Sequence, residues 1–184
     1  YRNYFLAAFL NEDGLITNLE MHDGCDLNKE RLSALMSQTT VTFNGNGYDL
    51  YMVAAALKGW TTQKLKSLSD EIILSKMSHW QVAKARDLNY PREWDSVDII
   101  NVLPGQASLK IYGARIGMPK LQELPIPHDA SIDAAGRDVL RRYCANDLRV
   151  TEALAKALAP QLELRRVMGE QYGLDLRSKG DAQI

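Results

Sequence analysis

The sequence predicts an α/β domain with a mixed central sheet flanked by helices. Two patterns favour this class: apolar, β-branched segments of strand length come first, and later ones alternate with stretches of helical periodicity. At 184 residues, one domain can bury about two-thirds of its unfolded surface. Apolar residues make up 46% of the chain and charged residues 24%, which indicates a folded globular protein rather than a disordered one.

The first third of the chain predicts a hairpin and then the first half of a βαβ unit. Two apolar strands flank a turn with the favoured pair Asp13-Gly14. After a capped helix, a short β-branched strand leads through a glycine-containing turn into an apolar helix that stops at Gly59. The expected elements are strands at 4–10 and 15–21, a helix capped by Asp26, a strand at 39–43, a turn at 44–47 and a helix at 48–57.

Residues 60–95 predict a helical insertion in the sheet domain. Three tryptophans lie in or beside it: Trp60, Trp80 and Trp94. Tryptophans can stack on nucleobases, but the simpler interpretation is that all three pack the insertion against the core. Helices are expected at residues 62–75 and 78–88.

The last part of the chain predicts one more strand and a long helix. Pro160 is expected to break or kink that helix, because proline has no backbone N–H to donate. The expected elements are a strand at 97–102, a helix capped by Ser108 that runs to 116, a proline-containing loop at 124–127, a long helix from about 135 to 159 and its continuation at 162–172.

Charge and cysteine content set wide limits on function. The net charge of −1 lacks the basic excess of most nucleic-acid-binding modules, but it suits a nuclease that binds phosphate through metal ions held by carboxylates. Cys25 and Cys144 lie far apart in no metal-ligand spacing, so two free thiols in a cytoplasmic protein are expected. The sequence contains no run of about 18 apolar residues, so no membrane partner is predicted.

Asp49 is the first aspartate that packing alone does not explain. It follows the carboxyl end of a predicted buried strand, at the edge of the sheet where ligands of α/β folds bind. In a purely structural interpretation, Asp49 interacts with the helix dipole, while Asn44 and Asn46 form the turn beside their glycines. This motif alone favours neither interpretation.

Asp147 is the second such aspartate. It lies on the apolar stripe of the long predicted helix, four residues after Tyr143 and three before Val150. A carboxylate on a buried helix face needs a hydrogen-bonding partner or a cation to remain ionised. A metal ion could meet this need, as could a backbone group or an arginine from elsewhere in the fold.

Taken together, the two motifs resemble a known family. Asn44-x-x-x-Tyr48-Asp49 and Tyr143-x-x-x-Asp147 resemble the second and third motifs of the tyrosine-type four-carboxylate 3′→5′ exonucleases, which include the proofreading domains of DNA polymerases. Residues 108–120 resemble the helix between those motifs. The opening residues 1–6 and closing residues 176–184 resemble, more narrowly, bacteriophage DNA polymerases of family A.

The resemblance implies a ribonuclease-H-like fold and a catalytic site with two divalent cations, Mg²⁺ or Mn²⁺. Asp49 and Asp147 would bind metal, and Tyr143 would orient the water that attacks the 3′-terminal phosphodiester. Asn44 and Asn46 are the candidates for contact with the substrate, with a turn role as the alternative. The histidine-type relatives carry a histidine where Arg142 stands, so Tyr143 favours the tyrosine type.

The resemblance also implies partners and boundaries. The substrate would be a single-stranded DNA 3′ end in the bacterial cytoplasm, and a polymerase domain would follow in the same parent chain. Residues 1–172 would form the exonuclease domain, with the insertion at 60–95, and residues 173–184 would begin a linker. Asp98, in an otherwise apolar strand, either faces the cleft or bonds to a neighbouring loop, and the structural role is the one expected.

One family motif is missing from the sequence. The family's first motif, Asp-x-Glu, supplies two of the four carboxylates, and it occurs nowhere in this chain. In the phage relatives it immediately precedes the residues that match Tyr1, so we expect this sequence to begin just downstream of it. Two alternatives remain open: a catalytically inactive, DNA-positioning domain, and an RNA-processing exonuclease with the same carboxylates.

Overall fold

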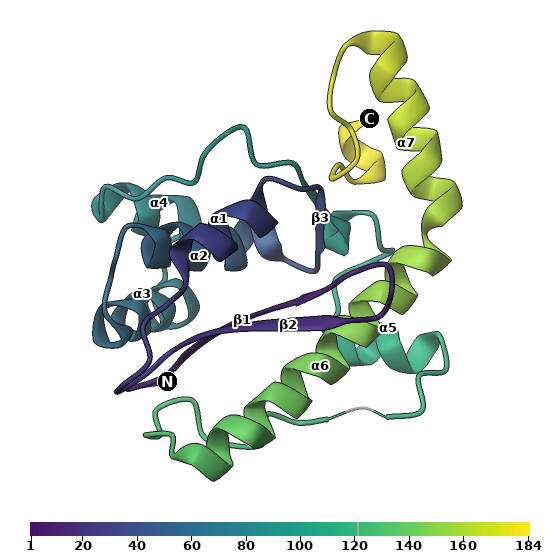
Figure 1. Cartoon of the computed structure of the whole chain (residues 1–184). Coiled ribbons are helices and arrows are strands. Elements are labelled where there is room, and N and C mark those ends of the chain that lie inside the picture. The colour runs from purple at the N-terminus through teal and green to yellow at the C-terminus, as the bar shows by residue number, and fades with distance from the viewer. Residues whose placement is uncertain (121) are drawn as a thin grey trace.

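The computed structural model describes residues 1–120 and 122–184, and its strands form two pairs (Figure 1). Strands β1 (Phe5–Leu10) and β2 (Ile16–Met21) are antiparallel. Strands β3 (Thr40–Thr42) and β4 (Ser96–Asp98) are parallel. The mixed α/β class is therefore confirmed. In the described residues the two pairs remain separate, however, so the expected single central sheet is not formed.

The α-helices extend along much of the rest of the described chain. They are α1 (Lys29–Met36), α2 (Asp49–Leu57), α3 (Thr62–Leu74), α4 (His79–Ala85), α5 (Leu109–Arg115), α6 (Ala134–Ala157) and α7 (Ala159–Tyr172). Within the part of the chain that the structure describes, no helix combines the length and apolar character needed to cross a lipid bilayer.

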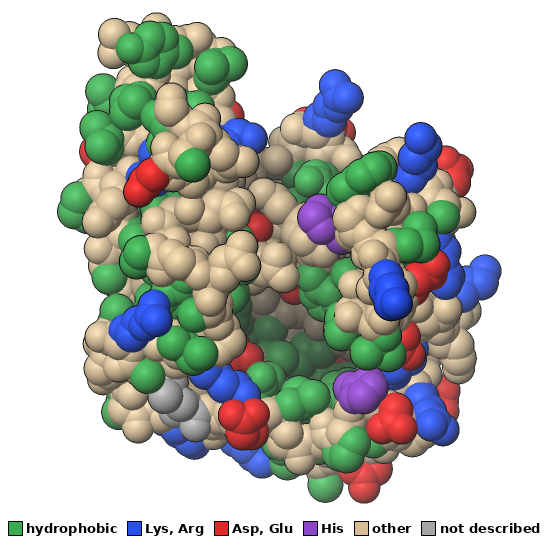
Figure 2. Space-filling view, turned by 180° about the vertical axis from the view of Figure 1, so that it is seen from behind, with side chains coloured by type: hydrophobic (Ala, Val, Ile, Leu, Met, Phe, Trp, Pro, Cys, Tyr) green, Lys and Arg blue, Asp and Glu red, His purple; other side chains and the backbone are tan. Residues whose placement is uncertain are grey.

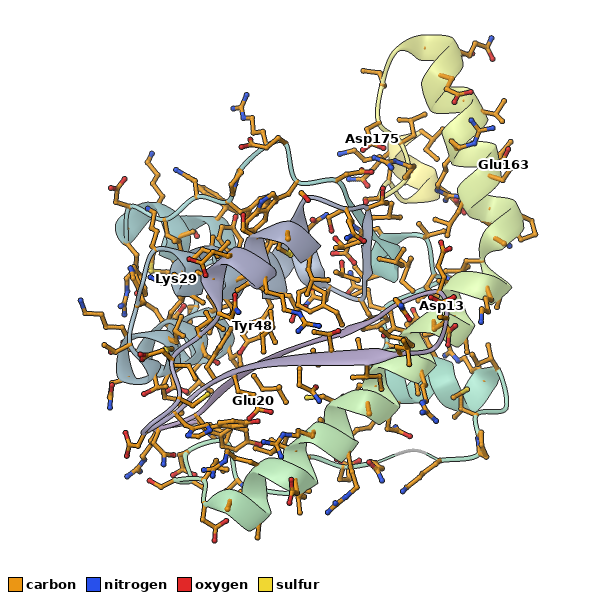
Figure 3. All side chains as sticks on the ribbon, in the orientation of Figure 1. Asp13, Glu20, Lys29, Tyr48, Glu163 and Asp175 are labelled. Carbon is orange, nitrogen blue, oxygen red and sulfur yellow. The ribbon has the colours of Figure 1, made fainter. Side chains whose placement is uncertain are left out.

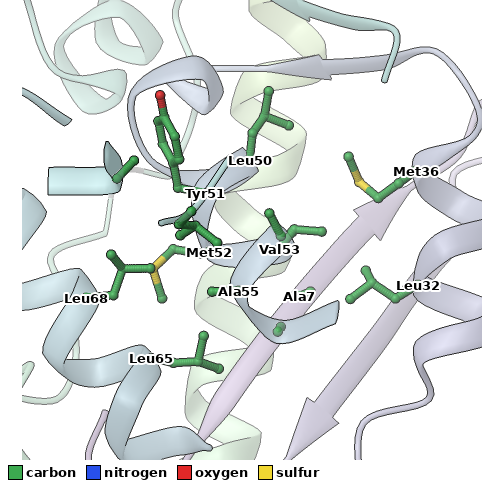
Figure 4. Close-up of a cluster of buried hydrophobic side chains, with 14 of the residues drawn as sticks. Ala7, Leu32, Met36, Leu50, Tyr51, Met52, Val53, Ala55, Leu65 and Leu68 are labelled. Carbon is green, nitrogen blue, oxygen red and sulfur yellow. The ribbon is translucent and has the colours of Figure 1, made fainter. Parts of the chain in front are cut away.

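Helix α2 forms the centre of the largest hydrophobic cluster (Figure 4). All seven residues from Leu50 to Ala56 are buried, so this helix is covered on every side. Its neighbours in the cluster are Ala7 of β1, Leu32 of α1, and Leu65 and Leu68 of α3. Because α2 is held so completely, the position of Asp49 at its first turn is fixed by the core.

Helix α6 crosses both strand pairs (Figure 1). Val150 and Leu154 of α6 pack with Val97 of β4, and the first half of the helix is fixed to the hairpin by an ion pair. Nε of Arg141 lies 2.5 Å from Oε1 of Glu20, and the Arg141 Nη2 donates to Oε2 of Glu20 at 2.8 Å. The Glu20 side chain extends from β2 towards α6 (Figure 3).

Three predicted details are corrected by the structure. Asn28, not Asp26, caps α1, because the Asn28 side chain accepts from the Arg31 backbone N–H at 2.8 Å. The strand predicted at 97–102 ends at Asp98, where the chain turns into the 3₁₀ segment Ile99–Asn101. A single residue, Leu158, separates α6 from α7, and Pro160 lies in the first turn of α7, where its missing N–H is not needed.

The predicted insertion contains both expected helices, α3 and α4. Trp60 and Trp94 pack against the main hydrophobic cluster, as expected. The same expectation is wrong for Trp80, whose residue surface is 54% exposed. Helix α4 is only two turns long and buries Val82 and Ala83, which leaves Trp80 on the outside.

The last residues of the chain pack against the domain. The buried Arg165 of α7 donates to the backbone oxygen of Lys179 at 2.8 Å and lies 2.5 Å from the Asp181 carboxylate. Arg177 pairs with Asp95, just before β4. These contacts attach the segment at 175–183 both to α7 and to the parallel strand pair.

Candidate functional site

Asp49 follows a tight turn that depends on small residues. Asn44 has a left-handed backbone conformation, with φ of 66°, and Gly45–Gly47 forms a single 3₁₀ turn that leads into α2. A Cβ atom at Gly45 would lie 2.3 Å from the Thr42 Oγ1, closer than packed atoms can approach. Glycine is therefore required at position 45 for the chain to pass from β3 to Asp49 within this space.

Asp98 holds this turn from the neighbouring strand. Its carboxylate accepts the backbone N–H of Asn44 at 2.8 Å and that of Asn46 at 2.9 Å. Asp98 is 1% exposed, and its own backbone N–H donates to the Ser178 Oγ at 2.8 Å. The expected bond between Asp98 and a neighbouring loop is thus confirmed. Asn44 and Asn46 both take part in this turn through their backbone N–H groups, as the structural interpretation of the sequence suggested.

The Asp49 carboxylate is reached by solvent although protein crowds it on most sides. This burial raises the pKa of Asp49 to about 6, with a further contribution from the negative charge of Asp98. Because the side chain remains open to solvent, screening by water moderates the penalty on its ionised form. Among the described residues, Asp49 has no salt-bridge partner.

Tyr143 and Asp147 lie one turn apart on α6, and each affects the other. Burial raises the pKa of the Asp147 carboxyl, and the Tyr143 hydroxyl opposes this shift by hydrogen bonding, as does the positive charge of Lys110. Burial also raises the pKa of Tyr143, and the Asp147 charge raises it further. Tyr143 therefore stays protonated at neutral pH and can donate a hydrogen bond.

The Cys144 thiol is influenced by the charges of both aspartates. Burial raises the pKa of its thiol to about 12, and the negative charges of Asp147 and Asp49 add to that effect. Both carboxylates therefore lie within electrostatic reach of one thiol, although no hydrogen bond joins them in the described residues. In that part of the chain, the structure brings together no group of three or more His, Cys, Asp or Glu side chains that could hold a metal ion.

Tyr1 lies near Cys144 and Tyr48. Burial raises the pKa of its side-chain hydroxyl to about 12, and the neighbouring Cys144 and Tyr48 groups add to this shift. The Tyr1 hydroxyl in turn contributes to the raised pKa of Tyr143. The first residue of this sequence is thus a neighbour of the two motifs that the sequence singled out.

A hollow of about 530 Å³ opens beside Asp49. Seen from behind, the molecule is hollowed at its centre, between the side formed by α3 and α4 and the side formed by α5 and α6 (Figure 2). Asn44 lines the hollow, whereas Asn46 contributes its backbone N–H to Asp98. The other wall comes from the insertion, through Ile73, Met77 and His79.

These insertion residues were missed from the sequence. His79, like His22 and His128, belongs to no motif in the sequence, and Ile73 lies on the apolar side of a predicted helix. Tyr48 connects the site to the insertion, because its hydroxyl lies 2.7 Å from the Ser69 Oγ of α3. A contact between residues so far apart in sequence leaves no local signal. The run of cationic and aromatic residues after Glu71 could have given a hint.

The comparisons with known proteins add no relative to this picture. No protein-family model matches the chain, and neither the curated proteins nor the solved structures include a match.

Proposed function

We propose that this chain is the 3′→5′ exonuclease domain of a DNA polymerase, with a ribonuclease-H-like fold. One contrast carries the proposal. The Asp98 carboxylate accepts hydrogen bonds from three backbone N–H groups, as expected of an aspartate with a structural role. Asp49 and Asp147 instead keep solvent-reachable carboxylates with raised pKa values and, among the described residues, no salt bridge. Carboxylates that remain unpaired at a loss of stability are typical of functional sites.

The donor chemistry of the two aspartates fits a hard divalent cation. Mg²⁺ and Mn²⁺ prefer oxygen ligands, and a cation would offset the unfavourable ionisation of both groups. Asp49 and Asp147 would hold such ions, which stabilise the attacking and leaving oxygens of an in-line displacement when they are bound. Tyr143 would donate its hydroxyl proton in a hydrogen bond that orients the attacking water. Asn44, at the rim of the hollow, would contact the terminal nucleotide, with Asn46 as a second candidate.

The family's first motif would enter the site beside Tyr1. Tyr1 is a neighbour of Tyr48 and Cys144, so an Asp-x-Glu directly upstream would bring its carboxylates to the same region. Helix α6 contacts both β1 and β3. A strand that precedes Tyr1 along this helix would join the two strand pairs into the mixed sheet that the family resemblance implies.

The experiment uses a protein extended upstream through an Asp-x-Glu. We expect it to shorten a 5′-labelled single-stranded oligonucleotide from its 3′ end in Mg²⁺ and to release nucleoside monophosphates, with no cleavage in EDTA. Asp49→Asn and Asp147→Asn should each abolish cleavage while leaving the thermal unfolding transition cooperative. Wild-type rates in either folded variant would refute the assignment of the site.

The second candidate is an inactive DNA-positioning domain, which is favoured by the lack of an Asp-x-Glu motif in this chain. Binding of the oligonucleotide by the extended protein, with no cleavage at any Mg²⁺ or Mn²⁺ concentration, would support it. Cleavage of RNA 3′ ends in strong preference to DNA would point instead to an RNA-processing exonuclease.

A further inference from the structure

The corner between α3 and α4 exposes large apolar side chains next to the hollow. Ile73 is 64% exposed, Trp80 54% and Met77 41%, and Ile73 and Met77 line the hollow together with Asp49. Contiguous exposed apolar side chains on a soluble protein mark a binding surface more often than chance. We refer to residues 72–86 as the insertion corner.

The insertion corner is also cationic. It contains Lys76, Lys84 and Arg86 and no aspartate or glutamate, in a chain whose net charge is −1. Arg86 pairs with Glu71, whereas Lys76 and Lys84 are exposed and form no salt bridge in the part of the chain that the structure describes. Lys84 follows Trp80 by about one turn of α4, so an uncompensated positive charge lies on the same helix as the exposed tryptophan.

We propose that the insertion corner binds the single-stranded 3′ end of DNA and guides it to Asp49. Trp80 stacks on a nucleobase, Met77 and Ile73 contact the base in the hollow, and Lys76 neutralises a backbone phosphate. The identity of the DNA end rests on the proposed function. The evidence for a binding surface comes from the exposed residues of the insertion corner itself.

Two observations favour this occupant over another partner. Exposed aromatic side chains combined with free cationic ones are the means by which proteins hold single strands without reading sequence. The surface is also continuous with the proposed site, because the same hollow has Asp49 on one wall and Met77 and His79 on the other. Its volume, about 530 Å³, is in the range of sites for small ligands and so can admit a nucleotide.

The test measures binding of a 5′-fluorescein-labelled oligothymidylate by fluorescence anisotropy in EDTA, where hydrolysis is absent. Trp80→Ala should weaken binding by at least about fivefold, since base stacking on an aromatic side chain contributes on the order of 1–3 kcal/mol. Trp80→Phe retains an aromatic face and should remain within about threefold of wild type. Tyr172→Ala, which removes an aromatic side chain 64% exposed on α7, is the matched control and should leave binding unchanged.

A second readout identifies the tryptophan directly. Stacking should quench part of the tryptophan emission of the wild type on addition of oligothymidylate, and Trp80→Phe should lose that quenching while still binding. Lys76→Ala should reduce the salt dependence of binding by about 0.7 in the log–log slope, the value for one phosphate contact with a single strand.

Each outcome separates this inference from the nuclease proposal. Binding that Trp80→Ala leaves within twofold of wild type, or no binding by the wild type at all, overturns the insertion corner as a DNA surface. Neither result affects a loss of cleavage in Asp49→Asn or Asp147→Asn. If Trp80→Ala weakens binding but the aspartate variants of the extended protein cleave normally, the insertion corner is supported as a DNA-binding surface and the catalytic site is refuted.

Discussion

The Asp98 carboxylate accepts the backbone N–H of Asn44 at 2.8 Å, across 54 positions of sequence. This bond ties the end of β4 to the turn that leads into α2, and the carboxylate also accepts from Asn46 and Ile100. One buried side chain thus fixes the backbone immediately ahead of Asp49. Asp98 also raises the pKa of Asp49 through its negative charge, so it both positions the proposed metal ligand and influences its ionisation.

Asp98→Asn should destabilise the protein by about 2 kcal/mol, because an amide offers one oxygen where two serve three N–H groups, and its NH₂ faces a buried donor. Urea unfolding at pH 7 measures the change. Asp13→Asn, in the exposed hairpin turn, is the matched control and should stay within about 0.5 kcal/mol of wild type. An Asp98→Asn variant as stable as that control would show that the turn holds itself without the carboxylate.

Gly45→Ala should also destabilise the turn, by about 1–3 kcal/mol, because the new methyl group would lie 2.3 Å from the Thr42 Oγ1 and 2.5 Å from its Cβ. The obstacle includes the Cβ atom itself, so a rotation of the Thr42 side chain does not relieve it. Gly136→Ala adds a methyl group within α6, 3.1 Å from its nearest neighbour, and should be tolerated. Thermal melts of both variants test the difference, and equal melting temperatures would contradict it.

The sequence was informative wherever the signal was local. The Asp-Gly hairpin, the helix periodicities and the glycine-containing turn before Asp49 all depend on neighbours within a few residues, and the structure contains them. The misplaced cap of α1 is also local in origin, since Asp26 and Asn28 are both good capping residues. Choosing between two adequate caps depends on how α1 packs.

Long-range relationships account for what could not be predicted. The strand β4 ends at Asp98, whose carboxylate accepts backbone N–H groups of the turn after β3, and this early end of the strand is not encoded in residues 96–102. Trp80 was expected to be packed because tryptophan usually is, but exposure depends on which side of α4 meets the core. The separation of the two strand pairs likewise depends on tertiary contacts.

The pair formed by Glu20 and Arg141 should contribute stability that depends on pH. The Arg141 hydrogen bonds hold the pKa of Glu20 below its ordinary value, so the contribution is complete above the unfolded pKa of about 4.3 and is lost as the pH falls through the lower folded value. Glu20→Gln should therefore cost about 1–2 kcal/mol at pH 7 and progressively less towards pH 3. Urea unfolding across this range tests it. A difference that stays constant with pH would show that the bidentate pair contributes little.

When measured in EDTA, Asp49→Asn should change the free energy of unfolding with the opposite sign to Glu20→Gln. The pKa of Asp49 is raised to about 6, so the folded state binds this proton more tightly than the unfolded chain does. The penalty is absent below about pH 4 and complete above about pH 6, so the variant should gain stability at pH 7 and lose that gain in acid. We expect about 1 kcal/mol, since solvent at the carboxylate screens the charge. An unchanged or lower stability at pH 7 would mean that Asp49 has a structural partner in solution.

Tyr143→Phe separates the positioning of water from the integrity of the fold. In the upstream-extended protein we expect cleavage of single-stranded DNA to slow by about 10²-fold, because one hydrogen-bond donor to the attacking water is lost while both aspartates remain. The unfolding transition should hardly change, since the aromatic ring remains and only the half-buried hydroxyl is removed. Removal of that donor should also raise the pKa of Asp147, because the Tyr143 hydroxyl now lowers it. The pH dependence of the residual cleavage should therefore shift upwards, which a loss of packing would not produce. An unshifted profile with unchanged kcat would assign Tyr143 to packing.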